Sequence, residues 1–249
     1  MKTLKWFALV LVHSLVTLGA SADDSSPDLA PHPVASKSGL NASGLIVSAP
    51  RIVSQLTGAE SPAQTHEPWN IYGADLGFPI EYDGKIYVVF GDTWGREDSE
   101  GADWRSNTMV EVEPHPVHGY VITDVIAGEN GEAKELLSSL KEPGVEYTVA
   151  PTAGIAVDDR IYLHYMSVKD WDMQWWNYKH PVVNGAGLAY SDDGGQTWVK
   201  DERAYWPGDS PFTQAAMVED DGKIYIFGTP AGRFGPARLL RVDDEDLLN

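Results

Sequence analysis

Two aspartates flank a hairpin-like stretch and are the residues best suited to chemistry. The stretch DLGFPIEYDGKIYVVFGDTWG covers residues 75–95, with apolar runs on both sides of Asp83-Gly84. Asp-Gly between two such runs is the strongest short-range signal for a two-residue hairpin turn. Cross-strand partners then have numbers that sum to 167, so Asp75 is expected directly opposite Asp92. Their Cβ atoms should lie ~4.5–5.5 Å apart if the ladder extends that far.

Such a pair of carboxylates suits acid–base chemistry. Like charges at this distance repel, so one aspartate is expected to hold its proton more tightly than a free aspartate does. In glycoside hydrolysis one carboxyl protonates the leaving oxygen, and the other acts as nucleophile or as base for water. The alternative is a structural pair that is solvated or balanced by arginine. The sequence leaves open which aspartate is the acid, and whether the outcome is retention or inversion.

The hairpin motif recurs, which predicts the architecture. Each copy has an apolar run, a tight acidic turn and a second run rich in β-branched and aromatic residues, which favours strands. The runs do not alternate with polar residues, so both faces of each hairpin should be covered. A β-propeller provides this cover, and a sandwich of unrelated hairpins is the competing interpretation. The copies are FPIEYDGKIYVVFGD (78–92), AGIAVDDRIYLHYMS (153–167) and AAMVEDDGKIYIFGT (215–229).

The other two copies serve as a control for the aspartate pair. The equivalent positions are Ala150 and Ser167 in the second copy, and Thr213 and Pro230, or Thr229 with a one-residue gap, in the third. Neither copy keeps a carboxylate, so the pair is a local addition to the first hairpin. A further fold marker is SDDGGQTW (191–198), which fits the Asp-box S-x-D-x-G-x-T-W and resembles the turn of sialidases and other propellers. Residues 131–142 form at most a short surface helix.

The N-terminal region predicts export. Residues 1–22 combine lysines, an apolar run and a small-residue cleavage site, as a secretory signal peptide does; an uncleaved signal anchor is the alternative. Residues 23–44 have the composition of a flexible linker, and Asn41 lies in an N-x-S sequon that could carry a glycan. We therefore expect a secreted protein.

Composition narrows the partners. There is no cysteine, which excludes disulfides and thiolate chemistry, and the formal net charge is −19. This charge disfavours nucleic acid and anionic membranes and suits a neutral or cationic ligand. We expect no cofactor and no metal site, because His115 and His118 have no ligand-like neighbour in sequence.

Other polar and aromatic residues are candidates for substrate binding. Trp94 follows Asp92, and Trp104, Arg105, Ser106 and Asn107 come soon after it. Arg105 and Asn107 suit sugar hydroxyls, although an arginine countering the aspartates is an equal alternative. His164 could face a central channel or be a satisfied core histidine. Trp176 lies in the aromatic insertion 169–187, which either stacks on sugars or packs on the next blade.

A family resemblance draws on several of these motifs. GADLGFPIEYDGKIYVVFGDTWG, WRSNTM (104–109), YSDDGGQTW (190–198) and FGTPAGRFGPARLLRV (227–242) resemble a secreted domain family formerly of unknown function. Some of its members are endo-D-arabinanases that cut mycobacterial arabinan. The resemblance, over about residues 45 to 249, implies a five-bladed β-propeller and a catalytic pair at Asp75 and Asp92. A non-catalytic carbohydrate-binding propeller and a sialidase are the alternative functions.

The number of hairpins predicts an incomplete ring. Propellers close with about four to eight blades, and only three hairpin copies are present. The run GLIVSAPRIVSQLTG (44–58) resembles a strand that would close the ring against a last blade. We therefore expect residues 45–249 to form an all-β propeller domain with about three blades and an N-terminal closing strand, truncated at its C-terminus.

Overall fold

The computed structural model describes residues 50–75, 77–96, 103–170, 182–233 and 235–248. The predicted signal peptide and linker, Asn41 and Trp176 lie outside these ranges. The chain divides into two compact units, Met1–Arg51 and Ile52–Asn249, and the description below concerns the second. Within the described ranges no helix has the length and apolar character needed to cross a membrane.

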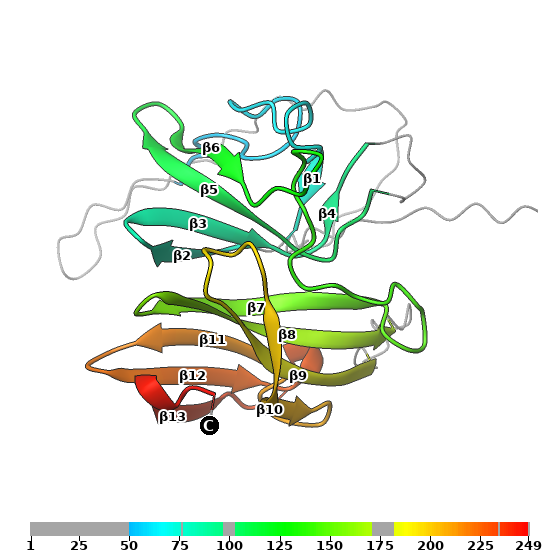
Figure 1. Cartoon of the computed structure of the whole chain (residues 1–249), viewed down its shortest axis with the longest axis vertical. Coiled ribbons are helices and arrows are strands. Elements are labelled where there is room, and N and C mark those ends of the chain that lie inside the picture. The colour runs from blue at the N-terminus through cyan, green and yellow to red at the C-terminus, as the bar shows by residue number, and fades with distance from the viewer. Residues whose placement is uncertain (1–49, 76, 97–102, 171–181, 234, 249) are drawn as a thin grey trace, which may run out of the picture. The chain divides into compact units, whose positions relative to one another are not determined.

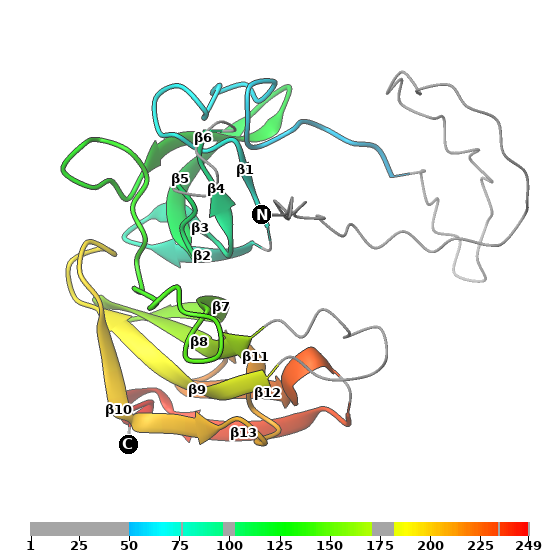
Figure 2. The same cartoon turned by 90° about the vertical axis from the view of Figure 1, so that its right-hand side faces the viewer.

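The second unit is built of antiparallel sheets whose strands follow the order of the chain (Figure 1). The first sheet contains β2 (Phe78–Tyr82), β3 (Lys85–Phe90), β5 (Thr108–His115) and β6 (Gly119–Val125). The second contains β7 (Thr148–Val157), β8 (Arg160–Asp170), β9 (Val182–Ser191) and β10 (Val199–Pro207), with β10 at one edge (Figure 2). The third contains β11 (Gln214–Glu219), β12 (Lys223–Thr229) and β13 (Arg238–Asp243). A separate two-stranded ladder joins β1 (Gly73–Ala74) to β4 (Thr93–Trp94), and the 3-10 turns are η2 (Ala231–Arg233) and η3 (Asp244–Asp246).

The predicted hairpin turns are confirmed. Asp83 and Gly84 have φ values of 50° and 69°, and Asp221 and Gly222 have 51° and 68°, as a type I′ turn requires. Phe78 pairs with Val89 and Tyr82 with Lys85, so the sum of 167 holds along the first hairpin.

One register prediction for the second hairpin is wrong. Ala150 pairs with Met166 rather than Ser167, because the register between β7 and β8 shifts between Pro151 and Ala153. The extra residue, Thr152, bulges out of the ladder and hydrogen bonds to His164. Ser167 instead pairs with Val149, and neither residue is a carboxylate.

The sheets pack face to face through two apolar clusters. One joins the first and second sheets and includes Ile80, Val89, Val149 and Leu163. The approach is close at Gly154, where an added Cβ would meet Phe78 and Ile80. The other joins the second and third sheets through Tyr162, Leu188, Ile224 and Ile226.

The remaining face of the first sheet is also covered. Phe90, Val110 and Ile122 pack with Ile71, and Leu56 and Trp69 cover this cluster from the preceding segment. The second strands of the first two hairpins, β3 and β8, are therefore covered on both faces, as their uninterrupted apolar runs predict. The third sheet differs, because Val218, Phe227 and Leu239 are 48%, 49% and 59% exposed.

The architecture is all-β, as predicted. Each of the three sheets is a meander, and β7 contacts both β2 and β11, so the first strands of the sheets adjoin one another. Successive propeller blades are arranged in this way. A five-bladed ring and its incompleteness stay predictions.

The predicted closing strand is wrong for the part that the structure describes. Residues 50–58 form no strand, and Ile52 is 90% exposed. The segment turns at Gly58, which has a φ of 90° and donates its backbone N–H to Thr65 Oγ1 at 2.8 Å. Because a strand needs a hydrogen-bonded neighbour, this segment cannot form one without a free sheet edge beside it.

The Asp-box forms the tight turn between β9 and β10. Asp193 accepts hydrogen bonds from the N–H and hydroxyl of Thr197 at 2.7 and 2.6 Å, and from the Ser191 hydroxyl at 2.8 Å. Gly194 and Gly195 take positive φ values of 70° and 92°. Trp198 donates its indole N–H to the Gly195 carbonyl at 2.9 Å and packs on the cluster between the first two sheets. The motif is thus a structural turn here.

Candidate active site

The backbone brings Asp75 and Asp92 together at the open end of the first hairpin. The Asp75 N–H donates to the Asp92 carbonyl at 3.0 Å, and the Gly91 N–H donates to the Asp75 carbonyl at 2.9 Å. Two residues therefore face one, which is the hydrogen-bond pattern of a β-bulge. Beyond it, Ala74 pairs with Thr93 and the predicted register resumes. Bulges are frequent next to active sites because they redirect side chains.

Asp92 is half-buried and accepts hydrogen bonds from two side chains. Its Oδ1 accepts hydrogen bonds from Trp104 Nε1 at 3.0 Å and from Thr148 Oγ1 at 3.3 Å. Burial and then the charge of Asp75 raise the pKa of Asp92 to about 6, against the opposing effect of Trp104, Thr148 and Lys141. The two carboxylates are thus close enough for the charge of Asp75 to affect Asp92, although the bulge replaces the direct pairing that the hairpin register predicts.

Asp75 has a different environment. The residue is exposed, although desolvation within the surrounding structure still raises the pKa of its carboxyl, and a backbone group of Asp92 acts in the opposite direction. Unlike Asp92, the Asp75 carboxyl accepts no hydrogen bond from a side chain in the described part of the chain. The pair thus combines one enclosed carboxyl with one that solvent or substrate can reach.

Aromatic rings lie beside Asp92. Trp94 stacks on Trp104 with ring centroids 5.8 Å apart, and Trp104 lies 5.0 Å from Tyr147. Burial and then the charge of Asp92 raise the pKa of Tyr147. Trp94, predicted to bind substrate, is therefore part of the surroundings of the aspartate pair. Its half-buried ring leaves part of an apolar surface accessible there.

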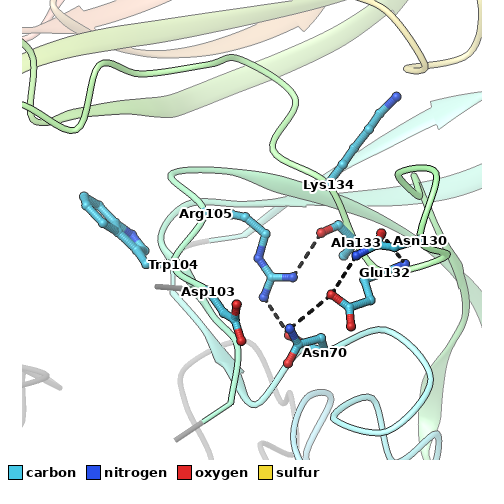
Figure 3. A pocket seen from close by; sticks show the side chains of 8 residues that line it. All are labelled: Asn70, Asp103, Trp104, Arg105, Asn130, Glu132, Ala133 and Lys134. Carbon is cyan, nitrogen blue, oxygen red and sulfur yellow. Dashed lines mark hydrogen bonds between the residues drawn. The ribbon is translucent and has the colours of Figure 1, made fainter. Parts of the chain in front are cut away.

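Arg105 points away from the aspartates, so its predicted position in their surroundings is wrong. Its Nη1 and Nη2 donate to the carbonyls of Ala133 and Asn70 at 3.0 and 2.6 Å (Figure 3). Trp104 donates to Asp92 Oδ1, whereas the guanidinium of Arg105 is used by these two backbone carbonyls. Arg105 instead lines a polar pocket of about 280 Å³, together with Asn70, Asp103, Trp104, Asn130, Glu132, Ala133 and Lys134.

Asn107 is a structural residue, and its predicted role in substrate binding is wrong. The side chain is fully buried. Its Nδ2 donates to the carbonyls of Leu137 and Val149 at 2.9 and 2.8 Å. Its Oδ1 accepts from the N–H groups of Leu136 and Leu137 at 2.9 and 2.8 Å. All four hydrogen-bonding positions of the amide are used, so none remains for a ligand.

His164 is a core histidine, so its predicted contact with substrate is also wrong. The ring is fully buried, which lowers its pKa to about 4. Nε2 lies 3.0 Å from the Phe212 carbonyl, which can only accept, so Nε2 carries the proton. Nδ1 then accepts from the Thr152 hydroxyl at 2.6 Å. His164 thereby ties the second sheet to the segment before the third.

Two neighbours of Asp92 carried no sequence signal. Tyr147 directly precedes β7 and Thr148 is its first residue, and both reach Asp92 only through the packing of the two sheets. Within the part of the chain that the structure describes, no group of three or more acidic, histidine or cysteine side chains is arranged to hold a metal ion.

Comparison with known proteins identifies a family. The family described as "Domain of unknown function (DUF4185)" matches residues 60–249. No curated protein shows significant sequence similarity to the chain.

Several solved structures share part of the fold. One is a GH130-family structure, from work on glycoside hydrolases that target β-1,2 mannosidic linkages in Candida mannan: 12% identity, TM-score 0.44, 70% of this chain and 50% of that one. Another is the GH43_1 enzyme from Xanthomonas citri with xylotriose. It has 15% identity and a TM-score of 0.43, and the match covers 70% of this chain and 52% of that one. A third is the xylan β-1,4-xylosidase from Bacillus halodurans. It has 11% identity and a TM-score of 0.41, and the match covers 73% of this chain and 31% of that one. The chain spans about half the length of the first structures it matches, and at these TM-scores none assigns it an activity.

Proposed function

The chain belongs to the DUF4185 family, and we propose that it is a glycoside hydrolase whose catalytic pair is Asp75 and Asp92. The observation that carries the proposal is the asymmetric pair of interacting carboxyls. Burial and the charge of Asp75 raise the pKa of Asp92 to about 6. Titratable groups with such differing surroundings are the usual basis of acid and base assignments.

The surroundings favour Asp92 as the general acid. Its carboxyl keeps a proton to higher pH than a free aspartate, so it can protonate the leaving glycosidic oxygen. Asp75 is exposed and would attack the anomeric carbon or activate a water. The Trp94 and Trp104 rings beside the pair would contact the C–H faces of a sugar.

The substrate class that we propose is a furanosidic polysaccharide, most simply an arabinan. The support is the resemblance of the DLG and GDTW motifs, which hold Asp75 and Asp92, to secreted endo-D-arabinanases. A net charge of −19 is compatible with a neutral polymer. Secretion, proposed from residues 1–22, would place the enzyme where such polymers occur.

The test is hydrolysis of a polysaccharide panel by the wild type and by Asp75→Asn and Asp92→Asn, with product sizing. We expect each variant to lose ~10²–10⁴-fold in kcat/KM, since general acid–base catalysis has this magnitude. Because Asp92 must be protonated, wild-type kcat/KM should fall above a pH of about 6. Asp193→Asn, in the Asp-box turn, is the matched control and should keep its activity.

Two outcomes would contradict the proposal. Near-normal turnover by either variant would remove the catalytic assignment of that aspartate. Binding of a polysaccharide by the wild type, with no cleavage of any member of the panel, would favour a non-catalytic carbohydrate-binding domain. The anomeric configuration of the first product, followed by NMR, would distinguish retention from inversion.

A further inference from the structure

A lysine lies against the tryptophan that binds Asp92. The Nζ of Lys141 is 3.9 Å from the ring centroid of Trp104, within the range of a cation–π contact. The same ammonium donates to the Ser106 hydroxyl at 2.7 Å and lies 2.6 Å from Glu135 Oε2. Three different groups therefore fix the position of one cation.

The surrounding loop holds this cation in place. Glu135 accepts hydrogen bonds from the N–H groups of Ser106 and Ser139 at 2.7 and 2.9 Å, so the carboxylate is itself anchored. Lys141 has a φ of 58°, a left-handed conformation that is uncommon for a residue other than glycine. Such backbone strain persists where surrounding contacts compensate for it, and these positions cluster at functional sites.

The contact connects the cation to Asp92. The indole N–H of Trp104 donates to Asp92 Oδ1 at 3.0 Å, while Lys141 lies over the ring of the same indole. A cation over the face of the ring draws electron density away from the indole N–H. The N–H then becomes a stronger hydrogen-bond donor to a carboxylate. The charged and titratable groups that act on Asp92 from the described elements are Asp75, Lys141 and Tyr147, with Glu135 behind the lysine.

We infer that Lys141 is a positioning residue for Asp92: it holds the Trp104 indole in place and, through it, stabilises the carboxylate form. Burial and Asp75 favour the protonated form, and Lys141 opposes them. The carboxyl can then both release a proton and regain one near neutral pH, as a group that acts as acid and later as base must. This consequence rests on the proposed function, whereas the effect of Lys141 on Asp92 does not.

The test uses Lys141→Met, which removes the charge, keeps an unbranched side chain and leaves a non-glycine residue at the positive φ. The carboxyl of Asp92 is titrated by NMR in ¹³C-aspartate-labelled protein without substrate, and Asp92→Asn identifies its signal. Loss of a nearby positive charge disfavours the carboxylate, so we expect the titration midpoint of Asp92 to rise by on the order of half a pH unit. If the protein hydrolyses a polysaccharide, the alkaline limb of kcat/KM should move in the same direction.

Lys200→Met is the matched control. Lys200 also lies over an aromatic ring, Tyr165, at 5.3 Å, and donates to a backbone carbonyl, that of Ser138. It does not contribute to the environment of Asp92, so the Asp92 midpoint should stay in place. In a Trp104→Phe background, which removes the N–H and keeps a ring, Lys141→Met should shift the midpoint less than in the wild type.

Each result decides a different question. An unchanged Asp92 midpoint in folded Lys141→Met, even with lower thermal stability, would show a purely structural lysine and overturn the inference. An equal shift with and without the indole N–H would overturn the transmission through Trp104. A shifted midpoint with no hydrolysis of any polysaccharide would support the inference while contradicting the proposed function.

Discussion

At the residue scale, the two aspartates differ in how each is held. Asp92 accepts an indole N–H and a hydroxyl, and is half-buried between the first and second sheets. Asp75 is bound mainly through its backbone and remains exposed. A buried acid whose pKa lies above its unfolded value is less stable when ionised than when protonated. The ionised form of Asp92 is therefore disfavoured in the folded protein, at the residue proposed to act as the acid.

This difference predicts a gain in stability from Asp92→Asn at neutral pH. The folded-state pKa of Asp92 is about 6, above the 3.8 of a free aspartate, so its contribution is favourable below pH 3.8 and is lost as pH rises through 6. Asn cannot ionise and still accepts from Trp104 and Thr148. The full shift corresponds to about 3 kcal/mol at pH 7. Because Asn accepts weaker hydrogen bonds than a carboxylate, we expect stabilisation by about 1–2 kcal/mol at pH 7, and little below pH ~4. Urea unfolding at both pH values measures it, and destabilisation at pH 7 would contradict it.

The sequence predicted the aspartate pair but not the roles of other polar residues near it. The pair follows from a turn type and a period of two, both of which are local rules. Arg105 and Asn107 suit sugar hydroxyls, and His164 interrupts an apolar run as a channel-facing residue would. Each of the three nevertheless hydrogen bonds to backbone groups distant in sequence. The partners of a buried polar side chain depend on tertiary packing, which local patterns do not encode.

At the element scale, tight turns and a bulge determine the registers. The Asp83-Gly84 and Asp221-Gly222 turns set the first and third hairpins as predicted. The second hairpin departs at Thr152, where one extra residue shifts every later pair. This bulge was not predictable from the sequence, because its reason is a contact of Thr152 with His164 and with the N–H of Ala215 at 3.3 Å. The bulge and the histidine together join the second sheet to the third.

The link predicts a pH-dependent loss in His164→Ala. Removing a fully buried ring that bonds both Thr152 and Phe212 should destabilise the protein by about 3 kcal/mol at pH 7. The wild-type histidine is neutral, with its pKa lowered to about 4, so its stabilisation is present above pH 6.5 and is lost as pH falls toward 4. The variant's deficit should therefore shrink at pH 4.5.

Urea unfolding at the two pH values checks this expectation. His66→Ala is a suitable control, because His66 lies in a loop and its contacts, with the Gln64 carbonyl, the Glu67 carboxylate and the Tyr72 ring, are all close in sequence. A deficit for His164→Ala that is the same at pH 7 and pH 4.5 would contradict the neutral, buried state of the ring.

At the scale of the whole molecule, the third sheet has one covered and one exposed face. Ile224, Ile226 and Leu240 pack toward the second sheet. Phe227 pairs with Leu239 across β12 and β13, and Val218 shares their face of the sheet; these three side chains are about half exposed. The repeats in the sequence predicted the sheets and their order. They could not show whether another layer covers this face, because repeats specify a blade and not the number of its neighbours.

The exposed face predicts self-association. Contiguous exposed apolar side chains mark interaction sites or aggregation risks. We expect the chain to associate at micromolar concentration, and Phe227→Thr with Leu239→Thr to reduce both association and binding of the dye ANS while keeping β-propensity. Val117→Thr is the control, because Val117 is a 69% exposed residue in a loop. Light scattering measures association, and a monomeric wild type that does not bind ANS would contradict the expectation.

The bulge that joins Asp75 to Gly91 and Asp92 has a consequence for how this family can vary. The turn at Asp83-Gly84 and the ladder from Phe78 to Val89 fix how far each arm of the hairpin extends before it reaches the bulge. Inserting or deleting one residue in a single arm would move one aspartate to the other face of the strand, because side chains alternate with a period of two. Compensating changes would have to occur in both arms at once. Relatives that keep the pair should therefore keep the length of residues 76–91 even where their substitutions are many, while the loops beyond the pair remain free to change in length.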